Sequence, residues 1–168
     1  MHRVVAFVAA LATLLSGAAA FASSSSQECI QLAYLRPHRP LVEPAAARLL
    51  VGDINVARAQ RGLQPLVQDD ALSQFALQVA EQMAARHYFG HTDPNGITFE
   101  DRLRAARFPY NYAAENMAFD QDEAHANQAF LHSPGHYANI VDSHPRRVGT
   151  AVVAAGDGEV FFVEEFAD

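Results

Sequence analysis

Three short motifs between Phe89 and Ile140 carry side chains that could bind a metal ion or move a proton. They read FGHTDP, AENMA and HSPGHYANI, and they supply His91, Glu115 and His136. Two imidazoles and one carboxylate are a common ligand set for Zn²⁺, and they are also a common acid–base set for hydrolysis. Because the three residues lie far apart in the sequence, only the fold can bring them together.

Both histidines occupy settings that suit a metal ligand. Gly90 relaxes the chain before His91 and the segment 93–96 forms a turn after it, so a tight loop carries the ring. Such a loop suits a ligand histidine, whose second ring nitrogen needs a fixed acceptor. His136 lies near the first turn of a predicted helix, where the helix dipole favours the neutral imidazole. Taken singly, either histidine is also compatible with an ordinary surface position.

Glu115 lies in the apolar run Ala113–Ala118, where a carboxylate is costly to bury without a partner. Two interpretations of the residues are open. In one, Glu115 ends a strand and meets water. In the other, its carboxylate pairs with both histidines, and the three side chains form one cluster.

Local signals predict the helices that must position these side chains. Pro44 starts a helix that ends at Gly62. Its buried stripe consists of Leu50, Ile54 and Ala57. Asp69 or Asp70 caps a second helix, whose apolar residues recur at spacings of three and four. These residues are Leu72, Phe75, Val79 and Met83.

The remaining helices are shorter. One follows Thr98, with Asp101 as its capping-box partner and Leu103 facing inward. Residues 124–131 form another, and Ser133-Pro134 supply the N-cap and first residue of a helix that contains His136.

The end of the chain changes to strand periodicity. Residues 147–154 and 159–167 are β-rich, and the segment 155–158 is a hairpin signal between them. A third strand is expected over 112–118, because helices on both faces of a sheet need that width to bury their apolar stripes. The sequence therefore predicts an α/β fold, a three-layer α-β-α sandwich with a small central antiparallel sheet.

The first 22 residues have the features of a cleaved secretory signal. Arg3 precedes a short apolar run, and Ala20-Phe21-Ala22 is a site for signal peptidase. Residues 23–43 are rich in Ser and Pro and are expected to form a flexible leader, although their apolar residues leave packing on the domain open. One folded domain is expected over 44–168. The protein is predicted to be secreted or periplasmic, with no stable membrane span once the signal is removed.

The amino-acid composition limits the kinds of partner that the protein can bind and the interactions that can stabilise its folded domain. All 12 basic residues are arginines, and against 19 acidic residues they leave a net charge of −7, or −8 once Arg3 is lost with the signal. An acidic chain without basic clusters argues against binding to nucleic acid or to anionic lipid. The one cysteine, Cys29, lies in the expected leader, so disulfides do not hold the domain together. A monomer is expected.

The ordered motifs resemble the CAP superfamily (cysteine-rich secretory proteins, antigen 5 and pathogenesis-related 1), in its cysteine-poor bacterial SCP form. The resemblance begins at LVGDINVARAQRGLQPL and ends at VFFVEEFA, which is nearly all of the expected mature chain. It implies the same α-β-α layering.

The resemblance also implies that His91, Glu115 and His136 converge in one cleft. Many eukaryotic members add a second Glu three residues before the last His, and here Ser133 holds that place. Three donors would leave an open position on a bound Zn²⁺ and would bind it more weakly than four. As an N-cap, Ser133 is expected to have its hydroxyl committed to backbone N–H groups.

Other polar residues receive structural interpretations. A bonding role at helix ends and strand junctions is expected for Asn55, Arg58, Arg102, Asn116 and Asn139. A surface role is expected for His87, His125, His132 and His144.

Three functions compete. The first is a secreted, non-catalytic CAP domain whose His/Glu cleft binds a small or lipid-like ligand, with or without zinc. The second is a zinc-dependent hydrolase, with His91 and His136 as ligands and Glu115 as ligand or general base. The third is a structural protein of the cell envelope.

Overall fold

The computed structural model describes residues 40–156 and 158–168. The expected signal peptide, Cys29 and all but the last residues of the expected leader lie outside this part of the chain. No helix within it combines the length and the apolar character needed to cross a membrane.

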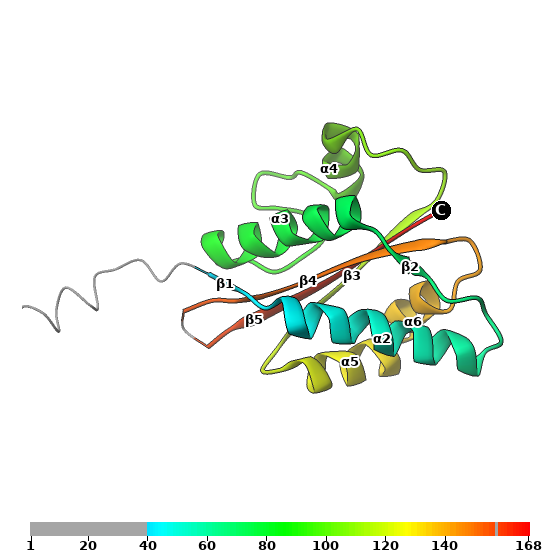
Figure 1. The fold of residues 1–168 in the computed structure, drawn as a ribbon. Helices are drawn as coiled ribbons and strands as arrows, with labels where there is room; N and C mark the ends of the chain where they lie inside the picture. Colours follow the sequence, from blue (N-terminus) through cyan, green and yellow to red (C-terminus); the bar gives the residue numbers. More distant parts are fainter. Residues whose placement is uncertain (1–39, 157) are drawn as a thin grey trace, which may run out of the picture. The chain divides into compact units, whose positions relative to one another are not determined.

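Helices cover both faces of a five-stranded sheet, so the predicted α/β sandwich is confirmed (Figure 1). The strands are β1 (Leu41–Val42), β2 (Val67–Gln68), β3 (Ala113–Asp120), β4 (Arg147–Ala154) and β5 (Val160–Ala167). Their order is β1-β4-β5-β3, with β2 also paired to β4. All pairs are antiparallel except the short β2–β4 pair, which is parallel.

Two helices, α3 (Asp70–Arg86) and α4 (Phe99–Ala106), lie on one face of the sheet. The other face is covered by α2 (Pro44–Gln60), α5 (Glu123–His132) and α6 (Pro134–Ile140). Each face has its own apolar core, centred on Phe162 and Phe166 under α2 and on Phe161 and Val163 under α3. The central strands are therefore buried on both sides.

The chain enters the sheet before the first long helix. Leu41 and Val42 pair with Ala154 and Val153 of β4, so the end of the expected 23–43 leader belongs to the sheet. The backbone N–H of Glu43 then donates to Val152, and Pro44 is the first residue of α2, where its missing N–H leaves no bond unmade.

The local signals of α3 and α4 act as expected. Asp69 accepts from the backbone N–H of Leu72 at 2.9 Å and caps α3, whose predicted apolar stripe is buried. Thr98 and Asp101 form both bonds of a capping box, which sets where α4 begins. The side chains of α4 that face the sheet are therefore defined by local chemistry.

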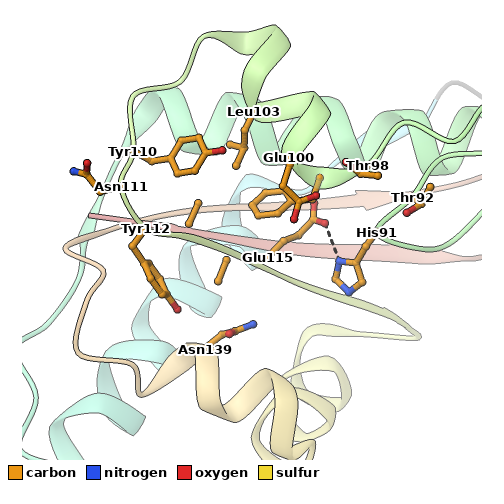
Figure 2. A pocket seen from close by; sticks show the side chains of 13 residues that line it. His91, Thr92, Thr98, Glu100, Leu103, Tyr110, Asn111, Tyr112, Glu115 and Asn139 are labelled. Atoms are coloured by element: carbon orange, nitrogen blue, oxygen red, sulfur yellow. Dashed lines mark hydrogen bonds and ion pairs between the residues drawn. The ribbon is translucent and has the colours of Figure 1, made fainter.

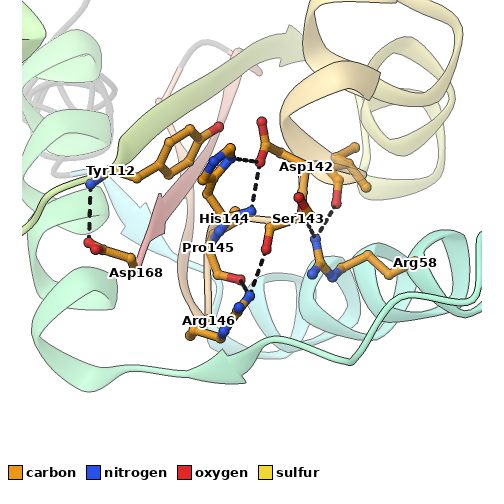
Figure 3. A network of polar contacts seen from close by, with 9 residues as sticks. Arg58, Tyr112, Asp142, Ser143, His144, Pro145, Arg146 and Asp168 are labelled. Carbon is orange, nitrogen blue, oxygen red and sulfur yellow. Dashed lines mark hydrogen bonds and ion pairs between the residues drawn. The ribbon is translucent and has the colours of Figure 1, made fainter.

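Two residues hold α6 to the rest of the domain. Buried Arg58 of α2 donates to the backbone oxygens of Ile140 and Asp142, at 2.9 and 2.7 Å, where α6 ends (Figure 3). Asn116 of β3 donates to the backbone oxygen of His136 at 3.1 Å, and its own side-chain oxygen accepts from Asn139 at 2.8 Å. These bonds agree with the structural role expected for Arg58, Asn116 and Asn139.

Glu164 is the buried carboxyl group in this network. It lies opposite Asn116 in the β3–β5 register and accepts from the Asn116 amide at 2.9 Å. Burial, reinforced by the charge of Asp53, raises the pKa of Glu164 from 4.5 to about 8. The protonated carboxyl is therefore the favoured form in the folded protein at neutral pH.

We predict that stability falls as the pH rises from about 5 to about 8, and that Glu164→Gln removes much of this fall. In the unfolded chain Glu164 loses its proton near pH 4.5, whereas the folded protein keeps it until about pH 8. Each pH unit between these values favours unfolding by about 1.4 kcal/mol, so the effect reaches a few kcal/mol. Urea unfolding at several pH values measures it.

The exposed Glu81 of α3 supplies the control. Glu81→Gln should leave the pH profile of the wild-type protein unchanged. Equal profiles for the wild type and Glu164→Gln would contradict the assignment of a buried proton to Glu164.

Candidate functional site

A cavity of about 560 Å³ opens beside the first half of β3 (Figure 2). We call it the β3 pocket. Its lining comes from residues 91–92, the start of α4, the segment 110–112, the first residues of β3, and Asn139 of α6. The pocket therefore combines segments that are distant in the sequence, and it includes two of the three predicted site residues, His91 and Glu115.

Glu115 is held by Arg102 at the inner end of the β3 pocket. The Glu115 side chain is 1% exposed, and Nη2 of Arg102 contacts its two carboxylate oxygens at 2.8 and 2.7 Å. Nη1 of Arg102 donates to the backbone oxygen of His91 at 2.9 Å. Arg102 does bond a backbone group, as expected, but sequence reasoning missed its pairing with Glu115. A hint was present, since Arg102 adjoins the inward-facing Leu103 on a helix whose start is set by a capping box.

His91 completes this group from the side open to solvent. Its Nδ1 lies 2.8 Å from Oε1 of Glu115, and 55% of its side chain is exposed. The hydrogen bond to Glu115 is the main cause that raises the pKa of His91, against burial and the charge of Arg102, which lower it. Nδ1–H therefore donates to Glu115, and Nε2 has no partner among the described residues. Figure 2 shows this second nitrogen turned away from Glu115.

A second carboxyl group, Glu165, lies directly opposite Glu115 in the β3–β5 register. It is 1% exposed, and no donor in the described part of the chain reaches either of its oxygens. Burial, followed by the negative charge and close approach of Glu115, raises the pKa of Glu165 well above its usual value, so the neutral acid is favoured. Sequence reasoning did not single out Glu165. Two adjacent glutamates in a strand point to opposite faces of the sheet, and such a pair is usually explained by exposure of the strand to solvent.

His136 does not bond to the other two predicted residues. Its Nδ1 is buried and unpartnered within the described chain, and its ring meets Phe130 edge-on with centroids 5.3 Å apart. Burial lowers the pKa of His136, and the charge of His91 lowers it further, so the neutral ring is favoured. His136 is thus close enough to sense His91. No hydrogen bond or ion pair in residues 40–156 and 158–168 links it to His91 or Glu115.

Metal binding at the predicted trio stays a prediction. Residues 40–156 and 158–168 contain no group of three His, Cys, Asp or Glu side chains arranged to hold a metal ion. Both oxygens of Glu115 already accept hydrogen bonds, so its carboxylate fits better as the partner that orients His91 than as a direct ligand. Nε2 of His91 and Nδ1 of His136 are ring nitrogens that have no hydrogen-bond partner in the described residues.

Ser133 differs from expectation. It is the N-cap of α6 by position, but its side chain makes no capping hydrogen bond, so the prediction of a committed hydroxyl was wrong. Pro134 already removes one of the N–H groups that a cap would serve. Three other histidines have partners at the surface: Nδ1 of His125, His132 and His144 bonds to Asp122, the backbone of Gln128 and Asp142.

We predict that Arg102→Met destabilises the protein by about 3–5 kcal/mol at neutral pH, because it leaves Glu115 as a buried charge without its cation. Loss of the positive charge should also raise the pKa of His91 further. Denaturant unfolding and NMR titration of the His91 ring measure the two effects. Arg104→Met removes an exposed arginine two positions along the same helix, and it should change stability by less than about 1 kcal/mol.

The double variant Arg102→Met/Glu115→Gln tests the cause. It should recover part of the lost stability, since no buried charge remains. Equal losses for Arg102→Met and the double variant would show that packing, rather than the charge pair, explains the cost.

Comparison with known proteins places this geometry in a family. A sequence profile of the Cysteine-rich secretory protein family, CAP, matches residues 51–166. The uncharacterized protein YkwD of Bacillus subtilis (strain 168) is 30% identical over 103 residues, which make up 61% of this chain and 40% of that protein. The chain therefore spans less than half the length of this relative.

Solved structures agree on the fold. An extracellular protein containing a SCP domain from Bacillus anthracis has a TM-score of 0.66 at 25% identity, over 74% of this chain and 41% of that one. An outer surface protein from Borrelia burgdorferi has a TM-score of 0.67 at 22% identity, over 74% and 92% of the two chains. With the family profile covering most of the described residues, the chain belongs to the CAP, or cysteine-rich secretory protein, family.

Proposed function

We propose that this protein is an extracellular CAP domain that binds a small polar ligand in the β3 pocket and does not catalyse a reaction on it. The location is supported by the relatives described as an extracellular protein and an outer surface protein. It is also supported by the predicted secretory signal at residues 1–22.

The observation that carries the proposal is the bonding of Glu115. A general base needs a carboxylate oxygen that can accept a proton from the substrate or from water. Both oxygens of Glu115 accept from Arg102, one also accepts from His91, and the side chain is almost completely buried. We therefore assign Glu115 the role of orienting His91, and not that of a group that reacts with a substrate.

The side chain that Glu115 and Arg102 orient toward a ligand is the imidazole of His91. Arg102 fixes the His91 backbone and Glu115 fixes its Nδ1, so the ring is oriented by two bonds from buried partners. Its Nε2 then offers one oriented hydrogen-bonding position at the edge of an open cavity. A binding site gains affinity from such preorganisation, because less conformational freedom is lost when the ligand arrives.

A divalent metal is the second candidate, supported by the orphaned Nδ1 of His136. A buried ring nitrogen without a partner is unusual. The neutral ring that burial favours is the form that binds Zn²⁺. His136 and His91 would hold the ion, with Glu115 behind His91. Two protein ligands would give a weak site, and a bound ion there would polarise whatever ligand reached it.

We predict that small polar fragments bind in the β3 pocket. In a fragment screen followed by ¹H–¹⁵N NMR, shifts should cluster in residues 91–92, 98–100 and 110–115. Loss of one hydrogen bond is worth about 1 kcal/mol, so His91→Ala should weaken the best fragment roughly fivefold.

His125→Ala is the matched control, because its side chain is 56% exposed, close to the 55% of His91, and it also pairs with an acidic side chain. That variant should bind fragments as the wild type does. Fragments that cluster on another surface, or turnover of ester, peptide or glycoside substrates that Glu115→Gln abolishes, would contradict a non-catalytic site here.

For the metal candidate, we predict that excess Zn²⁺ raises the melting temperature by mass action, since the unfolded chain holds no such site. His91→Ala and His136→Ala should each remove the shift, and His132→Ala should keep it. A zinc-dependent shift that survives in His136→Ala would exclude the two-histidine site.

A further inference from the structure

The wall of the β3 pocket that lies across the cavity from His91 is aromatic. Hydrogen bonds and ring contacts fix the residues of this wall in place. Tyr110 and Tyr112 stand in the segment that precedes β3 (Figure 2). The carboxylate of Asp168 accepts from the backbone and side chain of Asn111, at 2.9 Å each. It also accepts from the backbone N–H of Tyr112 at 3.2 Å (Figure 3). Three bonds to one carboxylate fix the path of this loop, and they lower the pKa of Asp168 to about 2.

The ring of Tyr112 is fixed as well. It stacks on His144 with centroids 5.3 Å apart and an angle of 15° between the planes. Burial, and then Asp142, which bonds the phenol, raise the pKa of Tyr112 to about 12. Tyr110 is 40% exposed, and its hydroxyl has no partner in the described residues. The pocket thus has one wall of ordered aromatic rings, of which Tyr110 is open to a ligand.

Uncommitted polar groups lie around the same cavity. The carboxylate of Glu100, the hydroxyl of Thr92, the side-chain oxygen of Asn139 and Nε2 of His91 line or border it, and none bonds to another described residue. These groups come from the His91 loop, α4 and α6, so they surround the cavity instead of forming one patch. Most are uncharged, and both donors and acceptors are represented.

The charges disfavour an anionic ligand. Arg102, the buried cation beside the cavity, is neutralised by Glu115, and Glu100 adds a free negative charge. Among the residues that line the cavity, His91 is then the one side chain that could balance the negative charge of a phosphate, sulfate or carboxylate ligand. A lipid-like tail fits poorly as well, because it would strip water from the polar groups without offering them hydrogen bonds.

We propose that the β3 pocket binds a neutral saccharide, with a pyranose ring against Tyr110 and its hydroxyl groups bonded to Glu100, Asn139 and His91. A sugar ring has a weakly positive C–H face that matches the negative face of an aromatic ring. Its edge carries hydroxyls that both donate and accept, which match the uncommitted groups. The cavity of about 560 Å³ lies in the usual range for sites of small molecules. This inference rests on the proposed binding function and names its ligand class.

The test titrates neutral trisaccharides and charged probes into the full mature protein. The signals that are followed belong to residues 40–168. Cellotriose, maltotriose and triacetylchitotriose are titrated into ¹⁵N-labelled protein, with spermidine and inorganic phosphate as charged comparisons. At least one trisaccharide should shift residues 91–92, 100, 110–112 and 139, with a Kd that Tyr110→Ala weakens tenfold or more. Tyr110→Phe, which keeps the ring, should lose much less.

Phe119→Ala is the matched control, since Phe119 is an exposed aromatic residue outside the β3 pocket, 45% exposed against 40% for Tyr110. It should bind the trisaccharide as the wild type does. Retention of the protein on insoluble chitin or cellulose would show a polymer source for the sugar, whereas binding of the soluble trisaccharide alone would show a free one. Either result supports a saccharide site.

The two proposals fail separately. If fragments bind in the pocket but no trisaccharide shifts its residues, or if spermidine binds there more tightly than every sugar, the saccharide assignment is overturned and the binding function stands. If neither fragments nor sugars perturb the pocket, both are overturned.

Discussion

The pairing of Arg102 with Glu115 is the interaction on which the rest of the site depends. A carboxylate that is 1% exposed on the edge strand β3 is unfavourable unless a cation compensates it, and Nη2 of Arg102 contacts both of its oxygens. The same guanidinium holds the backbone of His91, and Glu115 holds the His91 ring. Strand, helix and loop are thus joined through one ion pair, and the capping box of α4 contributes by setting where Arg102 lies along the helix.

Helices on both faces of the sheet explain why so many carboxyl groups are buried. Adjacent residues of a strand point to opposite faces, so Glu164 lies under α2 and α6 while Glu165 lies beside Glu115. Each therefore meets a low-dielectric environment and favours its proton. Glu164 supports the Asn116 network that fastens α6, and Glu165 occupies the space behind Glu115. In a sheet with one solvated face, one of the two would be an ordinary surface residue.

The polar groups of the β3 pocket fall into two sets: those that are bonded to one another inside the protein, and those that are left to bond a ligand. The buried ones, Arg102 and Glu115, satisfy each other through their ion pair. The groups left over are an oriented imidazole, a fixed aromatic wall and several neutral hydrogen-bonding atoms. This division is typical of recognition, in which the protein supplies shape and complementary bonds, and it supports a ligand-binding role for this member of the CAP family.

The sequence by itself determined the elements and the approximate location of the site. Proline at the start of α2, Asp69 at the cap of α3 and the box of Thr98 and Asp101 act within a few residues, so they can be recognised without a fold. Only the tertiary structure decided that Arg102 meets Glu115, that Glu165 is buried, that Nδ1 of His136 has no hydrogen-bond partner in the described residues and that Leu41–Val42 join β4. Those outcomes depend on which distant segments approach each other and on how much water they exclude, and neither quantity is written in local spacing.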